Sequence, residues 1–549
     1  LLMQKGMAKM NCKKSLEFNQ YISAATEFAE KVLAQSKGCL LPDGICLKTG
    51  EPVKWNFEGG EKASISNLAN QQNLLRTLAA LAKITDTPKY YEFAKNIADY
   101  YFKHMQHQCG LLIWGGHRFL NLDNLQIAGI REKKGEIHEL KNCFPYYELM
   151  FEANHKATVN FIHAFWNAHV YNWQTLEVNR HGYYIPKQSR LWASSFEPHK
   201  PFESASSLSF LNAGNDLIYS AISLFLHNHE KGALLWAKRL AAQYFKARHP
   251  KTGLGSYMFN KALKIADTDN DMLTDSRYGD RAARQFGAEF GEAALEGYVL
   301  FEQQSKTIYY HNAVMLLKLA KKLNAYGSDI IDEVQKGLLA YAEYAYLPQK
   351  NIFKPLLADG SDLSGYILPR NGYYGAKGEK IEAFSASPHY LYSYILAFSL
   401  TGSINLWNIA RLIAIGNKLG DIGKSPADKP DLNFDTQNAE TNALYSMLEL
   451  YYTTQCECYL RLAAVIGTNI ISAKLADGYF VQSQNDKYAS FDCTEPLALL
   501  HLSAVLKHGN AGELPEYMTG EGYIHGNYEF SDGIVKPYTT VQLYKEKAD

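Results

Sequence analysis

Three short segments of the chain place histidine, glutamate or arginine beside glycine or polar residues, outside the long amphipathic stretches. His117 lies in the segment WGGHRF, Glu139 lies in EIHELKN, and Arg180 and His181 are adjacent in NRHG. A glycine next to a ligand lets the backbone and a bulky substrate approach closely. Imidazole and carboxylate groups are ligands for divalent transition metals. The three segments are therefore candidates for a metal site with a cationic neighbour.

Each segment alone also has an ordinary structural explanation. The chain contains 17 histidines, so a histidine near a glycine is expected by chance. Glu139 would serve equally as a helix cap, and Arg180 as the partner of a surface acid. No local ligand spacing such as H-E-x-x-H is present. The residue types and spacings by themselves leave the metal site open.

The elements that must position these segments are mainly helices, because a 3.6-residue apolar period dominates the chain. Tyr21, Phe28 and Val32 fall on one such face, and Thr87 and Pro88 have the pattern of a helix start. We expect helices near residues 21–33, 66–83, 88–101, 156–170, 205–228, 232–247, 288–303, 308–324, 330–346, 388–400, 403–418, 440–453, 455–473 and 495–508.

Short strand-like pieces lie between the helices, at residues 111–114, 119–122 and 366–368. No strand–helix alternation indicates a doubly wound sheet, and no linker divides the chain. Helices of similar length joined as hairpins predict an all-α dominated fold, an (α/α) toroid of about seven helical hairpins. We expect residues 1–549 to form a single catalytic domain, with residues 1–12 as an N-terminal extension or remnants of cloning.

The composition excludes some classes of partner. The 56 basic and 56 acidic residues give a net charge of +0, which argues against nucleic acid. No stretch approaches the roughly 20 apolar residues of a membrane span. The eight cysteines lack C-x-x-C spacing, so we expect reduced core thiols and a cytoplasmic protein. The alternative is a periplasmic protein whose signal peptide has been removed.

From about residue 50 to its C-terminus the chain resembles polysaccharide lyase family 2, the pectate lyases built on an (α/α) toroid. The resemblance rests on the segments LLIWGGHRFLNL, HELKNCFPYYELMF, FWNAHVYNW, NRHG, SFLNAGNDLIYSA, YGDRAARQFG and LPRNGYYG, which occur in the expected order. It implies a toroid with two arms of short β-strands that flank and close on the cleft. It further implies that His117, Glu139 and His181 are the metal ligands and that Arg180 is the catalytic base.

The implied ligand set has a chemical preference. Two imidazoles and one carboxylate suit Mn, Co, Ni or Fe better than Ca²⁺, which takes six to eight oxygens. We expect manganese first. In galacturonate the C5 proton is α to a carboxylate, and a divalent cation neutralises the charge that develops when this proton is removed. The electron pair then expels the C4 oxygen, so the reaction is an elimination and not a hydrolysis.

The base itself poses a chemical difficulty. A guanidinium is normally protonated and cannot accept a proton. The resemblance favours Arg180 as the base, but the chemistry equally allows Arg180 to stabilise the enolate while hydroxide removes the proton. Retention of activity by Arg180→Lys would favour the second account.

Other polar residues of these segments are candidates for substrate contacts. His138 would orient Glu139 or the substrate. The arginines of YGDRAARQFG are able to clamp uronate carboxylates, or they form structural salt bridges, for instance with Asp280 or Glu289. The full set of expected substrate-binding residues is His138, Lys141, Asn142, Arg281, Arg284, Arg370 and Tyr373.

The expected function is cleavage of α-1,4-linked polygalacturonate or oligogalacturonides by metal-assisted β-elimination. We expect an exo-acting pectate disaccharide-lyase that releases unsaturated digalacturonate. We expect a monomer. The alternatives are an endo-acting lyase of the same family, a glycoside hydrolase on the same scaffold, a non-haem iron oxygenase and a non-catalytic uronate-binding module. An ultraviolet-absorbing product separates a lyase from a hydrolase.

Overall fold

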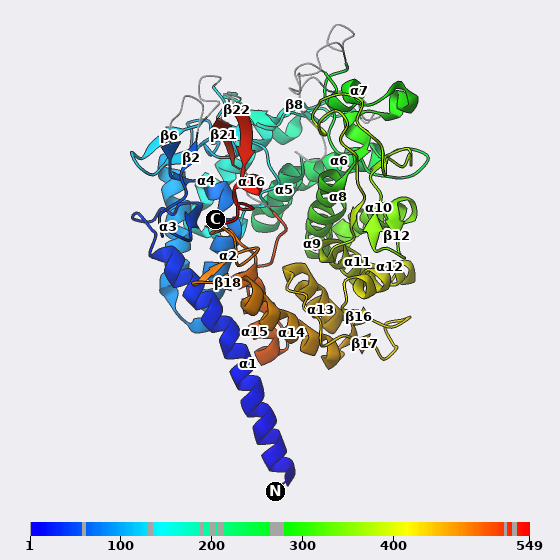
Figure 1. Ribbon diagram of the computed structural model, residues 1–549. Helices are drawn as coiled ribbons and strands as arrows, with labels where there is room; N and C mark the ends of the chain where they lie inside the picture. The colour runs from blue at the N-terminus through cyan, green and yellow to red at the C-terminus, as the bar shows by residue number, and fades with distance from the viewer. Residues whose placement is uncertain are drawn as a thin grey trace. The chain divides into compact units, whose positions relative to one another are not determined.

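The computed structural model describes residues 2–56, 62–129, 135–186, 191–197, 205, 214–263, 279–520, 524–529 and 535–548. The chain forms two compact units (Figure 1). The first contains residues 1–139, 143–161 and 432–549, and the second contains residues 140–142 and 162–431. The single-domain expectation stays a prediction.

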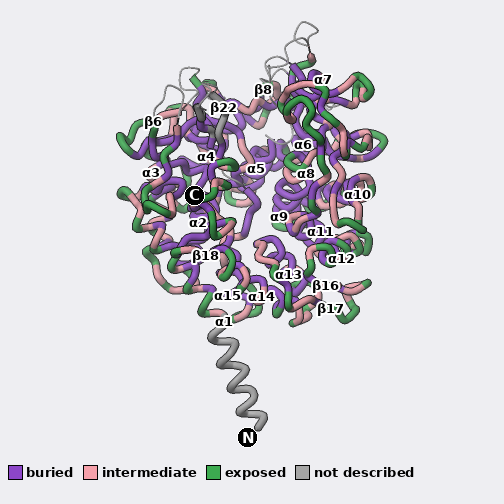
Figure 2. Tube along the Cα trace, viewed as in Figure 1, coloured by how far each residue is buried: buried purple, intermediate pink, exposed green. Residues whose placement is uncertain are grey.

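Six helices build most of the first unit. Helix α2 (Gln72–Thr85) pairs with α3 (Pro88–His104), and α13 (Thr441–Thr454) pairs with α14 (Glu457–Lys474). Helix α15 (Glu495–His508) packs against both α1 (Leu2–Leu33) and α2, so the two ends of the chain share one core. Figure 2 shows buried residues along these helices.

The second unit repeats the hairpin arrangement. Its pairs are α5 (Asn215–Asn228) with α6 (Lys231–Lys246), α9 (Ala313–Leu323) with α10 (Ser328–Ala345), and α11 (Pro388–Thr401) with α12 (Ile404–Gly416). The turns follow from local chemistry. Gly402 ends α11 in the left-handed conformation with φ +67, and Pro388 begins it at the first turn. Helix α4 (Tyr147–His169) departs from helical geometry at Asn154.

The remaining helical pieces are short. They are η1 (Leu68–Asn70), η3 (Leu191–Ala193), α7 (Arg281–Gln285), η6 (Ala288–Ala293), η7 (Glu296–Tyr298), α8 (Glu302–Lys306), the π-helix η8 (Thr307–Asn312), η9 (Asn324–Gly327) and α16 (Thr540–Leu543).

The described strands are short and antiparallel where their pairing is given. Two sheets have three strands, in the orders β4-β5-β6 and β12-β13-β15. The strands are β1 (Gly44–Cys46), β2 (Trp55–Asn56), β3 (Lys62–Ala63), β4 (Ile65–Ser66), β5 (Phe119–Asn121), β6 (Gln126–Ala128), β7 (His138–Glu139), β8 (Val170–Asn172), β9 (Glu177–Val178), β10 (His181–Gly182), β11 (Val299–Leu300), β12 (Tyr346–Leu347), β13 (Ile352–Phe353), β14 (Leu356–Leu357), β15 (Phe384–Ser385), β16 (Gly420–Asp421), β17 (Asp431–Leu432), β18 (Leu475–Ala476), β19 (Tyr479–Phe480), β20 (Tyr488–Ser490), β21 (His525–Glu529) and β22 (Val535–Thr539).

The helix-dominated fold built from helical hairpins is confirmed, but one predicted helix is wrong. Residues 288–303 form η6, η7, β11 and the start of α8 instead. Gly291 has φ +51 there, and an added Cβ at Gly297 would lie 2.4 Å from the Phe259 ring. These two glycines allow a sharp bend and a close approach that a continuous helix would prevent.

The other predicted elements differ mainly at their ends. The segment 119–122 is confirmed as β5, whereas 111–114 and 366–368 form only isolated bridges, through Leu112 to Gln106, Trp114 to His138 and Ile367 to Lys380. The helix expected at 205–228 is observed from Asn215, and residues 206–213 lie outside the described part.

The cysteines depart from the expected reduced core thiols. Cys456 and Cys458 form a disulfide at the start of α14, where one intervening residue keeps the two sulfurs close. Among the described free cysteines, Cys143 is buried, and Cys39, Cys46, Cys109 and Cys493 are half-buried.

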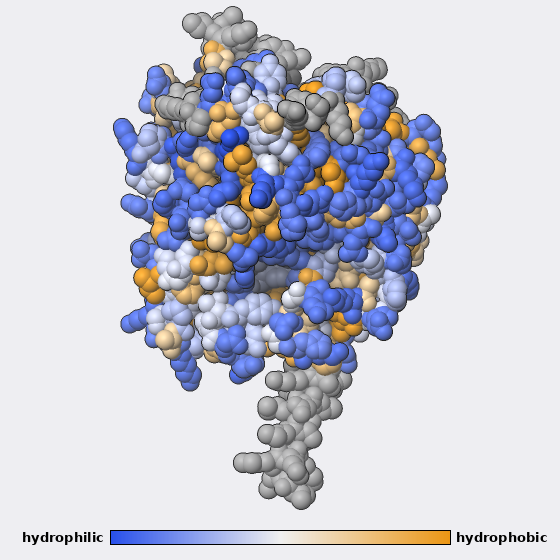
Figure 3. Space-filling view, turned by 180° about the vertical axis from the view of Figure 1, so that it is seen from behind, coloured by the Kyte–Doolittle hydropathy of each residue, from blue (hydrophilic) through white to orange (hydrophobic). Residues whose placement is uncertain are grey.

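The described helices include none that is long and apolar enough to cross a membrane. Hydrophilic residues cover most of the face drawn in Figure 3, with smaller apolar areas between them. That distribution agrees with a chain in which 20% of residues are charged.

Candidate active site and metal centre

Glycine 115 lets the WGGH segment lie directly against Glu139. An added Cβ at Gly115 would lie 2.7 Å from the Cβ of Glu139, and Gly115 has φ +118. The amide of Glu139 donates to the Trp114 carbonyl at 3.3 Å. On the other side, Asn67 Nδ2 donates to the Gly115 carbonyl at 2.6 Å. Only glycine accommodates both this backbone angle and this contact.

The imidazole of His117 and the carboxylate of Glu139 are buried neighbours. His117 Nε2 lies 3.4 Å from Glu139 Oε1, and the two residues are 4% and 1% exposed. The other carboxylate oxygen, Oε2, accepts a hydrogen bond of 2.8 Å from the Gly116 amide. The backbone of His117 also packs closely against Gly129, the residue after β6. An added Cβ at Gly129 would lie 1.8 Å from the His117 carbonyl oxygen.

Arg180 and His181 follow the β8–β9 hairpin. The Asn179 amide donates to the His169 carbonyl at 2.7 Å, and Asn179 Oδ1 accepts from the His181 amide at 3.0 Å. The Leu140 amide donates to the Arg180 carbonyl at 2.8 Å. Since Leu140 is bonded covalently to Glu139, this hydrogen bond brings the backbone of residues 180–181 beside the carboxylate residue.

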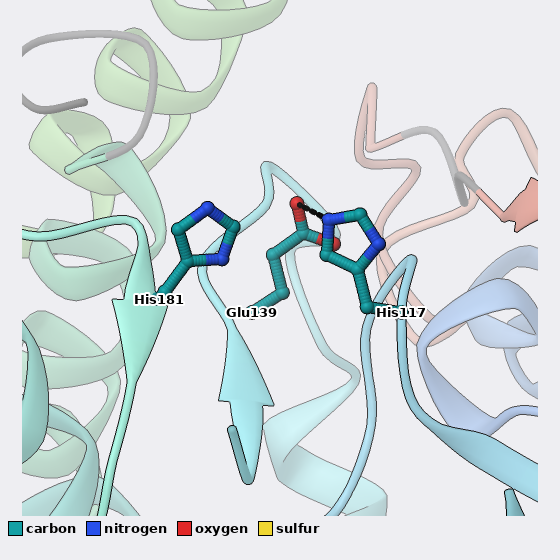
Figure 4. A group of neighbouring side chains, drawn as sticks. All are labelled: His117, Glu139 and His181. Carbon is teal, nitrogen blue, oxygen red and sulfur yellow. Dashed lines mark ion pairs between the residues drawn. The ribbon is translucent and has the colours of Figure 1, made fainter. Parts of the chain in front are cut away.

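The three residues predicted as ligands form one group. Single ligand atoms of His117, Glu139 and His181 all lie within 4.8 Å of one another, and all three residues are buried. Figure 4 shows the Glu139 carboxylate between the two imidazoles, with its ion pair to His117 dashed. Nitrogen and oxygen ligands lie roughly 2.0–2.2 Å from a transition metal such as zinc, so two ligands of one ion are about 3–4 Å apart. The group could therefore hold an ion after small side-chain rotations.

His138 points away from this group into an apolar contact, because neighbouring strand residues face opposite sides. Its Nε2 accepts a hydrogen bond from the Trp114 indole. Its ring lies 5.6 Å from that of Trp114 and 5.8 Å from that of Phe161, and the residue is 1% exposed. These contacts favour orientation of Glu139 over direct binding of substrate.

Lys141 and Asn142 continue the chain beyond Glu139, and both are half-buried. Asn142 Nδ2 donates to Asn312 Oδ1 at 3.2 Å, which fixes this stretch to the last residue of the π-helix. Their predicted contact with substrate stays a prediction.

Arg281 is engaged by the protein itself. Its guanidinium forms a buried ion pair with Glu296 and lies 3.6 Å from the centre of the Tyr373 ring. The structural salt bridge considered from the sequence is therefore present, but its partner is Glu296. Asp280 caps α7 by accepting from the Ala283 amide at 2.8 Å, and burial raises the pKa of Asp280 to about 6.

The side chain of Gln285, which the sequence analysis did not single out, binds the backbone of the loop that carries Arg370 and Tyr373. Gln285 Nε2 donates to the carbonyls of Arg370, at 3.2 Å, and Gly375, at 2.9 Å. Its Oε1 accepts from the Tyr374 amide at 2.8 Å. The loop that carries Arg370 and Tyr373 is thus fastened to α7. Arg284 on α7 is 5% exposed, and Tyr373 on the loop is 40% exposed.

Three residues that support the ligands were not predicted from the sequence. Gly129 acts through a backbone contact made in the folded chain, and Trp114 acts through a hydrogen bond to His138. Asn179 stands next to the predicted pair, and its place in NRHG was the one available hint.

Comparisons with known proteins give a consistent result at the level of sequence. A family described as "Periplasmic pectate lyase" matches residues 38–527. A pectate disaccharide-lyase of Dickeya dadantii is 33% identical over 554 residues, which cover 98% of this chain and 98% of that protein.

Solved structures show much weaker likeness. A D-mannose isomerase is 13% identical, with a TM-score of 0.39, and the match covers 81% of this chain and 96% of that one. A cellobiose 2-epimerase from Bacillus thermoamylovorans is 10% identical, with a TM-score of 0.39 and coverage of 89% and 100%. Likeness at this level supports no conclusion about the chemistry.

Proposed function

Because the chain belongs to the periplasmic pectate lyase family and is therefore a pectate lyase, we propose that it cleaves α-1,4-linked polygalacturonate and oligogalacturonides by metal-assisted β-elimination. The observation that carries this proposal is the buried group of His117, Glu139 and His181, whose ligand atoms lie within 4.8 Å. Two imidazoles and a carboxylate form a donor set for a divalent transition metal.

Manganese is the metal we propose, with cobalt, nickel or iron as alternatives. The donor set supports this choice over calcium, because two of its three groups offer nitrogen and calcium prefers oxygen. When bound, the cation supplies positive charge that acidifies the C5 proton of the uronate. Gly115 lets the loop before His117 lie against Glu139, and the Gly116 amide fixes one oxygen of Glu139.

Arg180 is the proposed base. Its backbone is fixed by Leu140 and by the hairpin, so its position relative to His181 is set by the chain itself. In its neutral form the guanidine takes the C5 proton. The C5–H electron pair then forms the C4–C5 double bond, and the C4–O bond breaks with its electrons leaving on the oxygen. Stabilisation of the enolate by a charged Arg180, with hydroxide as base, is the alternative.

We propose the mode of attack on the polymer from the name of a similar protein. The Dickeya dadantii protein is named a pectate disaccharide-lyase, which supports exo action and release of unsaturated digalacturonate. Endo action is the alternative. We also propose a monomeric enzyme with one catalytic domain over residues 1–549.

The compartment we propose is the periplasm. The family's description as periplasmic supports this alternative over the cytoplasmic expectation. The Cys456–Cys458 disulfide gives further support, because disulfides persist in oxidising compartments. Cell fractionation followed by activity assay of each fraction tests the proposal, and activity confined to the cytosol would contradict it.

One assay series tests the chemistry. The purified enzyme is treated with chelator, dialysed and supplied with single metals, and cleavage of polygalacturonate is followed by ultraviolet absorbance of the unsaturated product. We expect activity to vanish on chelation and to return with Mn²⁺. His117→Ala, Glu139→Gln and His181→Ala should each fail to recover, whereas the exposed-site control His508→Ala should behave as the parent enzyme. Full activity after exhaustive chelation would contradict metal dependence.

Chromatography of the early products tests the mode of attack in the same samples. Exo action predicts unsaturated dimer from the first time point. A ladder of longer unsaturated oligomers would indicate endo action. Arg180→Lys separates the two roles of Arg180, because retained activity would favour the account in which hydroxide is the base.

A further inference from the structure

Four of the seven tryptophans of the chain gather at the turn of the β8–β9 hairpin. Trp173 occupies the turn, and its ring lies 4.8 Å from that of Trp236 at an interplanar angle of 86°. The rings of Trp166 and Trp192 are 6.1 and 6.4 Å away. Edge-to-face aromatic pairs contribute about 0.5–1.5 kcal/mol each beyond the burial of area, so this turn is held firmly.

The partners of Trp173 come from three different elements. Trp166 lies on α4, Trp236 lies on α6, and Trp192 lies in η3. Hydrogen bonds tie the same elements together. Trp236 Nε1 donates to the Trp192 carbonyl at 3.0 Å, and the Glu197 amide donates to the Gln174 carbonyl in the turn at 3.1 Å.

A polar pair fixes the orientation of Trp192. Its indole donates to Glu230 Oε1 at 2.5 Å, and His163 Nε2 lies 3.1 Å from the same oxygen. The hydrogen bond with His163 lowers the pKa of Glu230. The carboxylate therefore stays ionised and keeps the Trp192 ring in place beside Trp173.

The β8–β9 hairpin connects the tryptophan cluster to the segment that carries Arg180 and His181. Strand β9 ends at Val178, and Asn179 follows at once. The backbones of Asn179 and His169 are joined by a hydrogen bond of 2.7 Å, and Asn179 Oδ1 accepts from the His181 amide at 3.0 Å. Each link from the tryptophans to His181 is thus either a covalent bond or a short hydrogen bond.

We propose that Trp173 is a positioning residue, which sets the backbone of Arg180 and His181 through the β8–β9 hairpin and thereby the affinity for the metal and the rate of turnover. The inference rests on the proposed metal-dependent lyase. Groups that orient metal ligands typically change metal affinity or activity by about 10- to 100-fold when they are removed. A role in packing alone would lower stability without this selective loss.

The test is titration of Mn²⁺ into the chelated full-length enzyme by calorimetry, together with steady-state kinetics at saturating Mn²⁺. Trp173→Ala should weaken Mn²⁺ binding by about 10- to 100-fold and lower kcat more than it raises KM. Trp173→Phe keeps an edge-to-face ring and should restore both values towards the parent. Trp173→Leu keeps an apolar side chain and serves where the alanine variant does not fold.

Two control variants separate positioning from loss of stability. Tyr171→Ala changes a 64% exposed ring on the same hairpin and should leave Mn²⁺ affinity unchanged. Trp407→Leu removes a fully buried indole of α12, which donates to the Gly423 carbonyl at 2.8 Å. It should lower Tm at least as much as Trp173→Leu while leaving Mn²⁺ affinity unchanged.

The result that overturns the inference is parent-like Mn²⁺ affinity in the folded Trp173→Ala or Trp173→Leu variant, or an equal loss in Trp407→Leu. His117→Ala distinguishes this failure from failure of the proposed function. If His117→Ala loses Mn²⁺ binding and the Trp173 variants keep it, the positioning inference alone is wrong. If His117→Ala binds Mn²⁺ like the parent, the proposed metal centre is wrong, and the inference falls with it.

Discussion

The amide of Gly116 donates a hydrogen bond of 2.8 Å to Glu139 Oε2, across 23 positions of sequence. The bond holds one carboxylate oxygen while the other lies 3.4 Å from His117 Nε2. The loop of residues 115–117 therefore supplies both the amide that binds the Glu139 carboxylate and the imidazole beside that carboxylate. The glycines of this loop matter because they let it lie against Glu139 without a side chain in between.

Gly115→Ala should damage the metal centre and the fold together. The new Cβ would meet the Cβ of Glu139 at 2.7 Å, at a backbone φ of +118 that L-residues rarely adopt. We expect a loss of about 1–3 kcal/mol in the free energy of unfolding and weaker Mn²⁺ binding. Urea denaturation and calorimetry measure the two effects.

Gly50→Ala is the matched control, because Gly50 has φ +70 but no atom within 4 Å of an added Cβ. It should lower stability without changing Mn²⁺ affinity. Equal Mn²⁺ affinity in Gly115→Ala and the parent would show that the close approach to Glu139 is not needed for the metal centre.

Removal of the metal should lower the thermal stability of the parent enzyme. A ligand present at 100 times its Kd stabilises the folded state by about 2.7 kcal/mol. We therefore expect chelation to lower Tm and Mn²⁺ to restore it in a concentration-dependent way. In His181→Ala the same additions should leave Tm unchanged, as differential scanning fluorimetry would show. A Mn²⁺-dependent rise in Tm that survives in this variant would place the ion elsewhere.

Glu296→Gln should destabilise the fold strongly. It leaves Arg281 buried without the carboxylate that balances its charge, and both residues are less than 10% exposed. Removal of one partner of a buried ion pair typically costs about 3–5 kcal/mol, which urea denaturation would detect.

The exposed pair of Lys380 and Glu382 provides the comparison, with side chains 56% and 67% exposed. Glu382→Gln should cost no more than about 1 kcal/mol. If Glu296→Gln lowers the free energy of unfolding by a similarly small amount, the ion pair with Glu296 is not what stabilises Arg281. Arg281 would then be available to bind a uronate.

The stability of the first unit should depend on pH through Asp492. Burial raises the pKa of Asp492 from 3.8 to about 8, although its carboxylate accepts amide hydrogen bonds from Asn73 and Leu74. A raised pKa means that the folded state holds the proton more tightly than the unfolded state. The stabilising contribution is therefore complete below pH 4 and is lost as the pH rises towards 8.

Asp492→Asn keeps an oxygen acceptor for the two amides and cannot ionise. We expect this variant to show a smaller decline in the free energy of unfolding between pH 4 and 8, and to be more stable than the parent at pH 8. Parallel curves for the two proteins in urea denaturation series over this range would refute the assignment.

The sequence by itself determined the class of fold and the identity of the candidate ligands. Apolar periodicity located most of the helices, since a helix that buries one face must repeat its apolar residues every three or four positions. The segments that contain His117, Glu139 and His181 carry the family resemblance that implied the ligand set. The predicted helix at 288–303 was wrong. Gly291 adopts a positive φ there, and Gly297 lies against Phe259, a contact that arises only in the folded chain.

Only the tertiary structure decided how these side chains are held and which of them already have partners. The pairing of Arg281 with Glu296, the contact of Gly129 with His117 and the packing of Trp173 against Trp236 all join residues through folded contacts. Such contacts depend on the packing of distant elements, and a periodic pattern reports which face of an element is buried but not what lies against it. The types of the candidate ligands could therefore be predicted from the sequence, whereas the packing of the folded chain fixed their geometry.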